Sequence, residues 1–375
     1  MADTDTSPPA PVKRSLLLRA GGPALVIALT ALFAVLANLP APRAAAPQLA
    51  GALAPVSLAT SVPTARPNVS ALPTFTPVPA SAIAAAVNIA NPQGAAPAGS
   101  LAYSVARVIG AEGNGPGEFN LPRAIAVGKD GRVYVVDQGN RRIQVFDAEG
   151  RYQFAFNQAN ASTALVEPFG IVMTSKNELL VIDAEDGGIF RYDAEGRPLG
   201  AFEVASRFYK PRGFSIDKAD NVYVTDTGGS RIIKITPNGD VALEINARGK
   251  EPGQLDQPCD AIGDPSGEIW VSDCVTGRIQ LFGADGAFKQ LFAITPSDPM
   301  NGSRLALGPD GALYVAAAPV HKVLKYSRTG QLLGDFGSEG REPGQFRVPT
   351  NLTFAGNVIW VTDLANGRIQ KLQPK

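Results

Sequence analysis

The sequence predicts an all-β protein, a six-bladed β-propeller made of four-stranded blades. Three observations lead to this prediction. The 375 residues include 39 Gly and 31 Pro, and only 18% are charged, a mix that suits turn-rich β structure better than helices. A short apolar run recurs six times, at intervals of 43 to 47 residues. It ends on an aspartate in five repeats and on an alanine in one, and we call this final residue the marked residue. Turns that contain Gly, Asp or Asn separate these runs, as they separate antiparallel strands.

The recurring run is the second strand of each predicted blade. Its final residues are Asp137, Asp183, Asp226, Asp273, Ala317 and Asp363. A shorter apolar stretch precedes each run, a hairpin partner such as RIQVF follows it, and a fourth run completes the blade. Four strands in about 45 residues is the period of a propeller. The predicted repeats are 108–150, 151–196, 197–239, 240–286, 287–330 and 331–375.

The two ends of the propeller domain, residues 103–375, are expected to share one blade. The sixth repeat stops after its third strand, whereas an additional strand at 103–110 precedes the first repeat. The stretch 110–122 is identical to 337–349 at 7 of 13 positions, which marks 103–110 as a displaced fourth strand. We therefore expect this N-terminal strand to join the last blade and close the ring, which removes a free sheet edge.

Four of the marked acids are followed, five residues later, by an arginine across a tight turn. The pairs are Asp137/Arg142, Asp226/Arg231, Asp273/Arg278 and Asp363/Arg368. The Asp can accept hydrogen bonds from N–H groups of the turn, and the Arg can close over it from the next strand. Four acids in a ring could instead hold a metal ion, but the paired arginines favour a structural role. We expect no metal ion and no other cofactor.

The first 102 residues are expected to lie outside the propeller. A basic segment, 1–19, precedes an uncharged stretch, 20–42, whose length lies between that of a signal peptide and that of a spanning helix. By the positive-inside rule, an uncleaved segment would be a single-pass anchor in the cell membrane with the propeller outside the cytoplasm. Cleavage would instead give a secreted protein. Residues 43–102 are rich in Pro and Ala and are predicted to be a disordered linker.

The stretch PGEFNLPRAIAVGKDGRVYVVDQGNRRIQVFDAEG resembles an NHL repeat, and the resemblance extends over all six repeats. It implies a bacterial-type NHL propeller. The RING and zinc-binding boxes of animal ubiquitin ligases with such repeats are absent, since the chain has two Cys and one His, and there is no kinase domain like that of bacterial receptor kinases with a similar propeller. Amidating lyases of similar form hold zinc with several histidines, which the lone His321 cannot supply.

Loops that lead into the innermost strands of a propeller surround the mouth of its central channel. The candidate ligand residues at this rim are Arg123, Phe169, Arg212, Asp260, Arg304 and Asn351. Three arginines with one carboxylate and no histidine suit the binding of an anionic or peptide group better than catalysis. The alternative is that these side chains only keep the funnel solvated. No catalytic residue is assigned.

The predicted function is that of a binding, scaffold or sensor module outside the cytoplasm, for a protein, a peptide or a cell-envelope ligand. The propeller is expected to be monomeric. Its 34 basic and 34 acidic residues give no general attraction to nucleic acid, which is not expected as a partner. The alternative is a metal-dependent hydrolase or lactonase-like enzyme in the central channel, for which only Asp260 and Asn351 offer oxygen ligands. Enzymatic activity is thus left open and is not the favoured interpretation.

The two cysteines, Cys259 and Cys274, are predicted to form a disulfide. If their hairpin has a two-residue turn, Cys259 falls opposite Ser272 and is a diagonal neighbour of Cys274. Diagonal Cβ atoms are ~7 Å apart, whereas a disulfide needs about 3.5–4.5 Å, so the strands would have to twist or bulge. An oxidising compartment favours the bond. Two free thiols are the alternative, and a one-residue shift of the hairpin would turn the two side chains to opposite faces.

Overall fold

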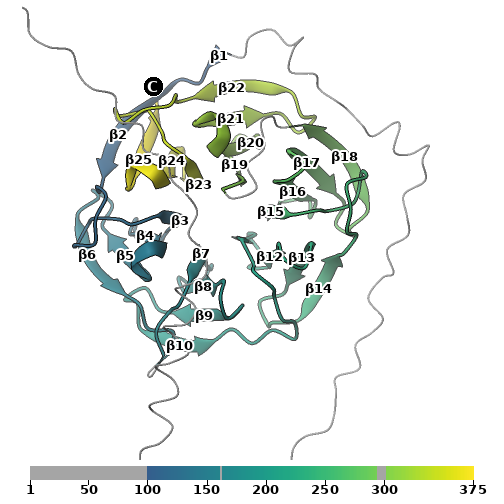
Figure 1. Cartoon of the computed structure of the whole chain (residues 1–375), viewed down its shortest axis with the longest axis horizontal. Coiled ribbons are helices and arrows are strands. Elements are labelled where there is room, and N and C mark those ends of the chain that lie inside the picture. Colours follow the sequence, from purple (N-terminus) through teal and green to yellow (C-terminus); the bar gives the residue numbers. More distant parts are fainter. Residues whose placement is uncertain (1–98, 161–162, 294–300) are drawn as a thin grey trace, which may run out of the picture. The chain divides into compact units, whose positions relative to one another are not determined.

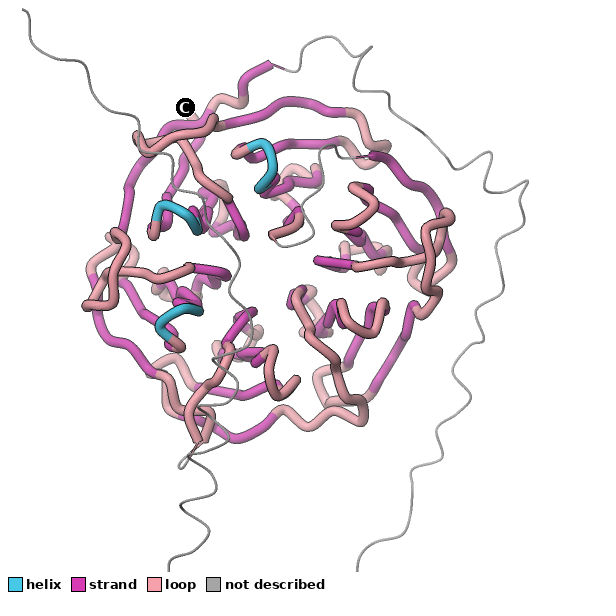
Figure 2. Tube along the Cα trace, viewed as in Figure 1, coloured by secondary structure: helices cyan, strands magenta, loops and turns pink. Residues whose placement is uncertain are grey.

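The computed structural model describes residues 99–375, apart from 161–162 and 294–300. Within that part the strands form six sheets around a central axis, which is the predicted six-bladed β-propeller (Figure 1). Figure 2 shows that helical structure is confined there to short turns. These are the 3₁₀ turns η2 (Gln138–Asn140), η3 (Ala318–Val320) and η4 (Leu364–Asn366).

Blades 1 to 3 are antiparallel sheets in which the chain runs from the innermost strand outward. Blade 1 comprises β3 (Pro122–Val127), β4 (Val133–Asp137), β5 (Arg142–Phe146) and β6 (Tyr152–Phe156). Blade 2 comprises β7 (Pro168–Met173), β8 (Leu179–Asp183), β9 (Ile189–Tyr192) and β10 (Pro198–Ala201). Blade 3 comprises β11 (Gly213–Ile216), β12 (Val222–Asp226), β13 (Arg231–Ile235) and β14 (Val241–Ile245).

Blades 4 to 6 repeat this order, with additions at the N-terminal side. Blade 4 comprises β15 (Pro258–Gly263), β16 (Ile269–Asp273), β17 (Arg278–Phe282) and β18 (Phe288–Ala293). Blade 5 comprises β19 (Ser303–Leu307), β20 (Leu313–Ala317), β21 (Lys322–Tyr326), β22 (Leu332–Phe336) and the added β1 (Gly99–Ser100). Blade 6 comprises β23 (Pro349–Ala355), β24 (Val358–Asp363), β25 (Arg368–Pro374) and β2 (Tyr103–Ile109).

The N-terminal strand closes the ring as the sequence predicts. β2 is the outermost strand of blade 6 and is antiparallel to β25, with Tyr103 opposite Pro374 and Ile109 opposite Ile369. The short strand β1 adds a further pairing, parallel to β22 at the outer edge of blade 5. The strand β1 therefore lies within the last residues of the predicted linker, 43–102. The basic segment, the anchor or signal segment, and the linker up to residue 98 lie outside the described residues.

The hydrophobic core lies between adjacent blades and is centred on the second strands. Large side chains near the start of these strands belong to clusters shared with the next blade: Tyr134 clusters with Leu179 of blade 2, and Trp270 with Leu313 of blade 5. Both aromatic residues are fully buried. Burial of one such side chain stabilises the fold by about 1.5–3 kcal/mol, so the repeated position holds neighbouring blades together. No helix of the described part is long and apolar enough to cross a membrane.

Candidate functional site

The channel mouth lies on the side of the propeller where each first strand begins and each second strand ends, which we call the mouth face. In blade 1, Arg123 is an extra residue in the pairing of the first two strands, because Pro122 lies opposite Asp137 and Ala124 lies opposite Val136. Such a bulge bends the strand and redirects the side chain of the extra residue. The extra residues of three further blades are Phe169, Cys259 and Thr350.

Arg304 reaches the channel by a different route, because blade 5 has no bulge at this point. Ser303 lies opposite Ala317 and Arg304 opposite Ala316, so Arg304 occupies a regular, inward position of the strand. Its side chain is 5% exposed. The Nη1 group donates to the carbonyl oxygen of Arg212 at 2.7 Å and to that of Cys259. One arginine of blade 5 therefore holds the starts of the first strands of blades 3 and 4.

Phe169 lies between two guanidinium groups at the mouth. The Cζ atom of Arg123 is 4.9 Å from the ring centre of Phe169, and the Cζ atom of Arg304 is 5.4 Å from it. Cation–π attraction stabilises such contacts, more strongly where water is excluded, and Phe169 is only 6% exposed. Arg123 is further held by the Oε1 atom of Gln138 at 3.1 Å and the Oδ1 atom of Asn301 at 3.3 Å. Blades 1, 2 and 5 are thus joined through one aromatic ring.

Asp260 is the carboxylate of this group, and it is almost completely buried. Its Oδ2 atom accepts a hydrogen bond from the backbone N–H of Leu305 at 2.8 Å, whereas its Oδ1 atom is 4.0 Å from the Nη1 atom of Arg304. Burial raises the pKa of Asp260 to about 6, because the long ion pair offsets only part of the cost of desolvation. Burial likewise lowers the pKa of the Arg304 guanidinium.

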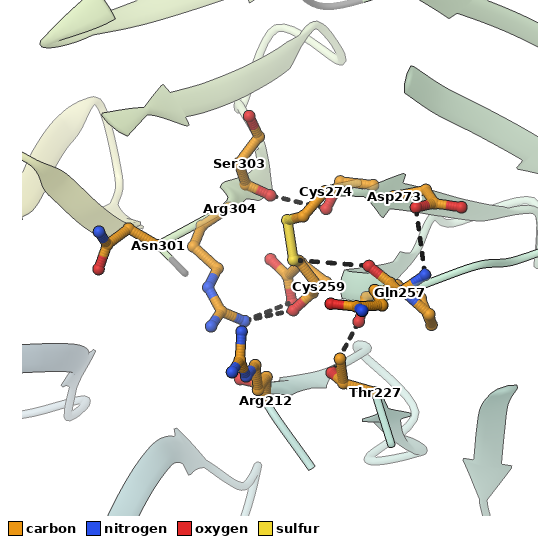
Figure 3. The surroundings of a disulfide bond; sticks show 12 residues. Arg212, Thr227, Gln257, Cys259, Asp273, Cys274, Asn301, Ser303 and Arg304 are labelled. Carbon is orange, nitrogen blue, oxygen red and sulfur yellow. Dashed lines mark hydrogen bonds and ion pairs between the residues drawn. A yellow bond between two sulfur atoms is a disulfide. The ribbon is translucent and has the colours of Figure 1, made fainter. Parts of the chain in front are cut away.

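A disulfide joins Cys259 and Cys274 beside this arginine, with the two Cα atoms 5.8 Å apart. Figure 3 shows the guanidinium of Arg304 against the carbonyl of Cys259, directly below the sulfur atoms. Gly302 packs on the other side, where a Cβ atom would lie only 2.3 Å from the sulfur of Cys274. The disulfide therefore lies between the start of blade 4 and the chain that leads to Arg304.

The register of the cysteine hairpin differs from the expected one. Asp260, not Cys259, lies opposite Ser272, because the turn is longer than two residues and includes Gly267 in a left-handed conformation, with φ at +86°. The bulge at Cys259 reverses this one-residue shift at the end of the hairpin. As a result, Cys259 lies beside Cys274 and the two side chains share one side of the sheet.

The other predicted rim residues are less central. Arg212 is half-buried and contributes its carbonyl oxygen to Arg304. Asn351 is half-buried in blade 6, and its carbonyl oxygen accepts a hydrogen bond from the hydroxyl of Thr362. Two hydrogen-bond partners of Arg123, Gln138 and Asn301, were not identified from the sequence. They lie in a turn of blade 1 and a loop of blade 5, where the sequence shows no repeat signal.

The Asp–Arg pairs of the second and third strands position the loops of the mouth face. Asp137 is fully buried and accepts from the Nε group of Arg142 at 2.7 Å and from the backbone N–H of Asn120 at 2.7 Å. That N–H belongs to the loop entering the blade, and the turn between the paired residues contributes the side-chain Nδ2–H of Asn140 at 2.9 Å. The ion-pair distances of the other pairs are 2.8 Å for Asp226/Arg231, 3.5 Å for Asp273/Arg278 and 2.7 Å for Asp363/Arg368.

Within the described residues, no three His, Cys, Asp or Glu side chains gather closely enough to hold a metal ion. At the mouth, Asp260 is instead surrounded by the N–H of Leu305 and the guanidinium of Arg304.

A sequence model of the NHL repeat matches residues 119–146, which contain the first three strands of blade 1. The chain therefore carries the NHL repeat that its sequence predicts. Human NHL repeat-containing protein 3 is 29% identical over 138 residues, which are 34% of this chain and 39% of that protein. Human E3 ubiquitin-protein ligase TRIM32 is 29% identical over 135 residues, 33% of this chain and 20% of the ligase. The chain thus spans less than two fifths of these relatives' length.

Solved structures resemble the NHL propeller in fold. Virginiamycin B lyase from Staphylococcus aureus has a TM-score of 0.51 and 17% identity, covering 68% of this chain and 98% of the lyase. The gluconolactonase XC5397 from Xanthomonas campestris has a TM-score of 0.53 and 17% identity, covering 75% of this chain and 99% of the lactonase. At such identities the likeness shows the propeller fold alone.

Proposed function

We propose that this NHL propeller is a binding or scaffold module whose protein or peptide partner docks on the mouth face. The observation that supports this is a series of exposed apolar side chains in the loops entering blades 1 to 3. Leu121 is 43% exposed, Val166 39% and Tyr209 68%. Arg123 lies just after the first of these residues and adds a positive charge at the channel mouth. A partner segment with apolar side chains and a carboxylate fits this combination.

The module is proposed to act outside the cytoplasm. The support comes from the basic residues before the uncharged stretch 20–42, which by the positive-inside rule leave the rest of the chain on the outer side. The proposal covers a membrane-tethered form and a secreted form, because the same stretch serves an anchor or a cleaved signal. The propeller acts as a monomer in this proposal, and nucleic acid is not its partner.

The docking proposal is tested by comparing capture of a partner from the cell envelope by the full chain and two variants. Tyr209→Ala combined with Leu121→Ser removes apolar contacts from the mouth face and should abolish capture. Leu333→Ser is the matched control, because Leu333 is equally exposed at 43% but lies in β22 at the outer edge. Equal capture by the double variant and the wild type would contradict docking on the mouth face.

A hydrolase in the central channel is the second candidate. Lactonase-like and lyase propellers are among the structures of similar fold, and Asp260 and Asn351 offer oxygen atoms near the mouth. Metal analysis of the purified full chain, together with a lactone-hydrolysis assay, tests this candidate. A stoichiometric divalent ion that is lost in Asp260→Asn, along with activity, would favour the enzyme over the binding module.

A further inference from the structure

Two blades carry a cross-strand ion pair where the third and fourth strands meet the mouth face. In blade 3, the Nη1 group of Arg231 is 3.2 Å from the Oε1 atom of Glu244. In blade 5, the Nζ group of Lys322 is 3.2 Å from the Oδ1 atom of Asp335. A cationic side chain of the third strand thus covers the end of the fourth strand in these two blades.

Blade 2 has neither side chain at the corresponding positions. In this blade Phe190 lies opposite Ala201, and in blade 3 Ile233 lies opposite Glu244, so the two pairs occupy equivalent positions. Gly188 lies two residues before Phe190, and it therefore corresponds to Arg231, two residues before Ile233. A pocket of about 160 Å³ opens at this place. Its lining includes Gly187, Gly188, Phe190, Phe202, Glu203 and Phe208. The missing cation and its missing acidic partner therefore leave room, and aromatic rings surround it.

Two acidic residues, Glu203 and Asp183, lie on or next to the lining of the pocket. Glu203 is exposed on the lining, and its carboxylate has no ion-pair partner within the described part of the chain. Asp183 lies beneath the pocket and donates its backbone N–H to the carbonyl of Gly188 at 2.9 Å. Among the described residues its buried carboxylate accepts only backbone N–H groups, such as that of Val166 at 2.7 Å, whereas the marked acids of four other blades each face an arginine.

We propose that this pocket binds a guanidinium group on an alkyl chain, such as the arginine side chain of a partner protein. A planar guanidinium stacks on aromatic rings, and Phe190, Phe202 and Phe208 are among the residues that line the space. The Glu203 carboxylate accepts its N–H groups. The volume is close to that of cavities known to hold benzene, about 150 Å³, so the pocket has room for one such side chain.

Blade 3 shows how a guanidinium group occupies the equivalent position. In blade 3, the guanidinium of Arg231 fills the same corner and contacts both Asp226 and Glu244. A partner's arginine would take that place in blade 2. The pocket lies beside the loop that carries Tyr209, so a segment docked on the mouth face can reach it, but binding of a small guanidinium compound does not require such docking.

The experiment compares two small ligands by saturation-transfer NMR and calorimetry with the full chain. N-acetyl-arginine amide should bind, and N-acetyl-citrulline amide, which has nearly the same shape without the charge, should bind at least tenfold more weakly. Free arginine distinguishes a peptide from a free amino acid as the source: it carries an α-carboxylate that the blocked compound lacks, and repulsion between this charge and Glu203 should make its affinity lower. Equal binding of the arginine and citrulline compounds would overturn the proposal.

Two variants locate the site. Gly188→Arg restores the side chain present in blade 3 and should abolish binding, since the chain's own guanidinium then fills the pocket. Gly188 is not in a left-handed conformation, and a Cβ atom there would meet only the edge of the Phe190 ring, at 3.1 Å. Glu203→Gln should weaken binding about three- to fivefold, as loss of an exposed charge pair does. Glu342→Gln, an exposed acid of blade 6, is the control and should have no effect. Undiminished binding by both site variants would refute this location.

Discussion

The guanidinium carbon of Arg304 lies 5.4 Å from the centre of the Phe169 ring, although the two residues come from blades 5 and 2, on opposite sides of the propeller (Figure 1). The same guanidinium donates to the carbonyl oxygens of Arg212 and Cys259 in blades 3 and 4. A single side chain therefore braces four blades across the channel. Its removal is the most direct test of what holds the channel mouth together.

Arg304→Ala is expected to lower the free energy of unfolding by about 3–5 kcal/mol, the usual cost of leaving one charge of a buried pair alone. The charge left behind is that of Asp260. Urea unfolding at pH 7 measures the loss. The double variant Arg304→Met with Asp260→Asn should recover much of the stability, because no buried charge remains. A single variant as stable as the wild type would show that Arg304 is not a brace.

Stability should depend on pH through Asp260. The folded protein holds this proton more tightly than the unfolded chain, because the pKa rises from 3.8 to about 6 on folding. The favourable contribution is fully present below about pH 4 and is lost as the pH rises through about 6. Between pH 4 and pH 7 the wild type should thus lose about 2 kcal/mol of unfolding free energy relative to Asp260→Asn. Parallel stability curves for the two proteins from urea unfolding would contradict this prediction.

Deletion of the closing strand should damage the fold far more than deletion of the linker. Removal of 103–110 takes away the strand that pairs with β25 and leaves the outer edge of β25 unpaired in blade 6. Removal of 41–98 leaves every described strand in place. The melting temperatures of the two truncated proteins, measured side by side, give the answer. Similar melting temperatures would mean that the ring does not depend on closure by β2.

The disulfide should be present in protein exported to an oxidising compartment. Mass spectrometry of non-reduced, alkylated protein should find Cys259 and Cys274 unmodified. Replacement of both by Ser should cost about 2–3 kcal/mol, since the bond closes a short loop. Recovery of two alkylated cysteines from exported protein would rule out the bond in its native state.

RNA is expected not to bind the propeller, although some animal NHL domains do bind it. Nucleic-acid affinity depends largely on neutralised phosphates, and the chain has as many acidic as basic residues. A titration with single-stranded RNA at two salt concentrations should show no affinity that falls steeply with salt. If such an affinity appeared, Arg123 and Arg212 at the mouth would be the first residues to replace.

The blades and the closure of the ring could be predicted from the sequence because each repeats a local pattern. The apolar run that ends at Asp137 or Asp363 fixes a second strand, and the likeness of 110–122 to 337–349 reveals the displaced fourth strand. Both signals arise from short stretches of chain in which every residue has the same neighbours from blade to blade. Local repetition thus determines the architecture.

The channel mouth could be predicted only as a list of positions. Arg304 and Asp260 remain predicted rim residues, and the bulges that set which side chains point inward depend on turn length and on Pro or Gly at the strand start. Contacts such as Arg304 with Phe169 join residues with no relation in sequence. The pocket of blade 2 likewise depends on the loss of a repeated residue, at Gly188. Whether the neighbouring side chains fill the vacated space or leave it open cannot be read from the repeat pattern.

The pairing of β2 with β25 also determines when the protein can finish folding during its synthesis. Tyr103 and Pro374 are 374 − 103 = 271 residues apart in the chain. A ribosome adds roughly 5–20 residues per second, so the first strand of the propeller waits on the order of 15–50 s for its partner to be made. Throughout that interval β2 has unpaired backbone groups while blades 1 to 5 assemble beside it. A chaperone that holds this segment, or a fast translocation that delivers both ends together, would therefore act on the step that completes the ring.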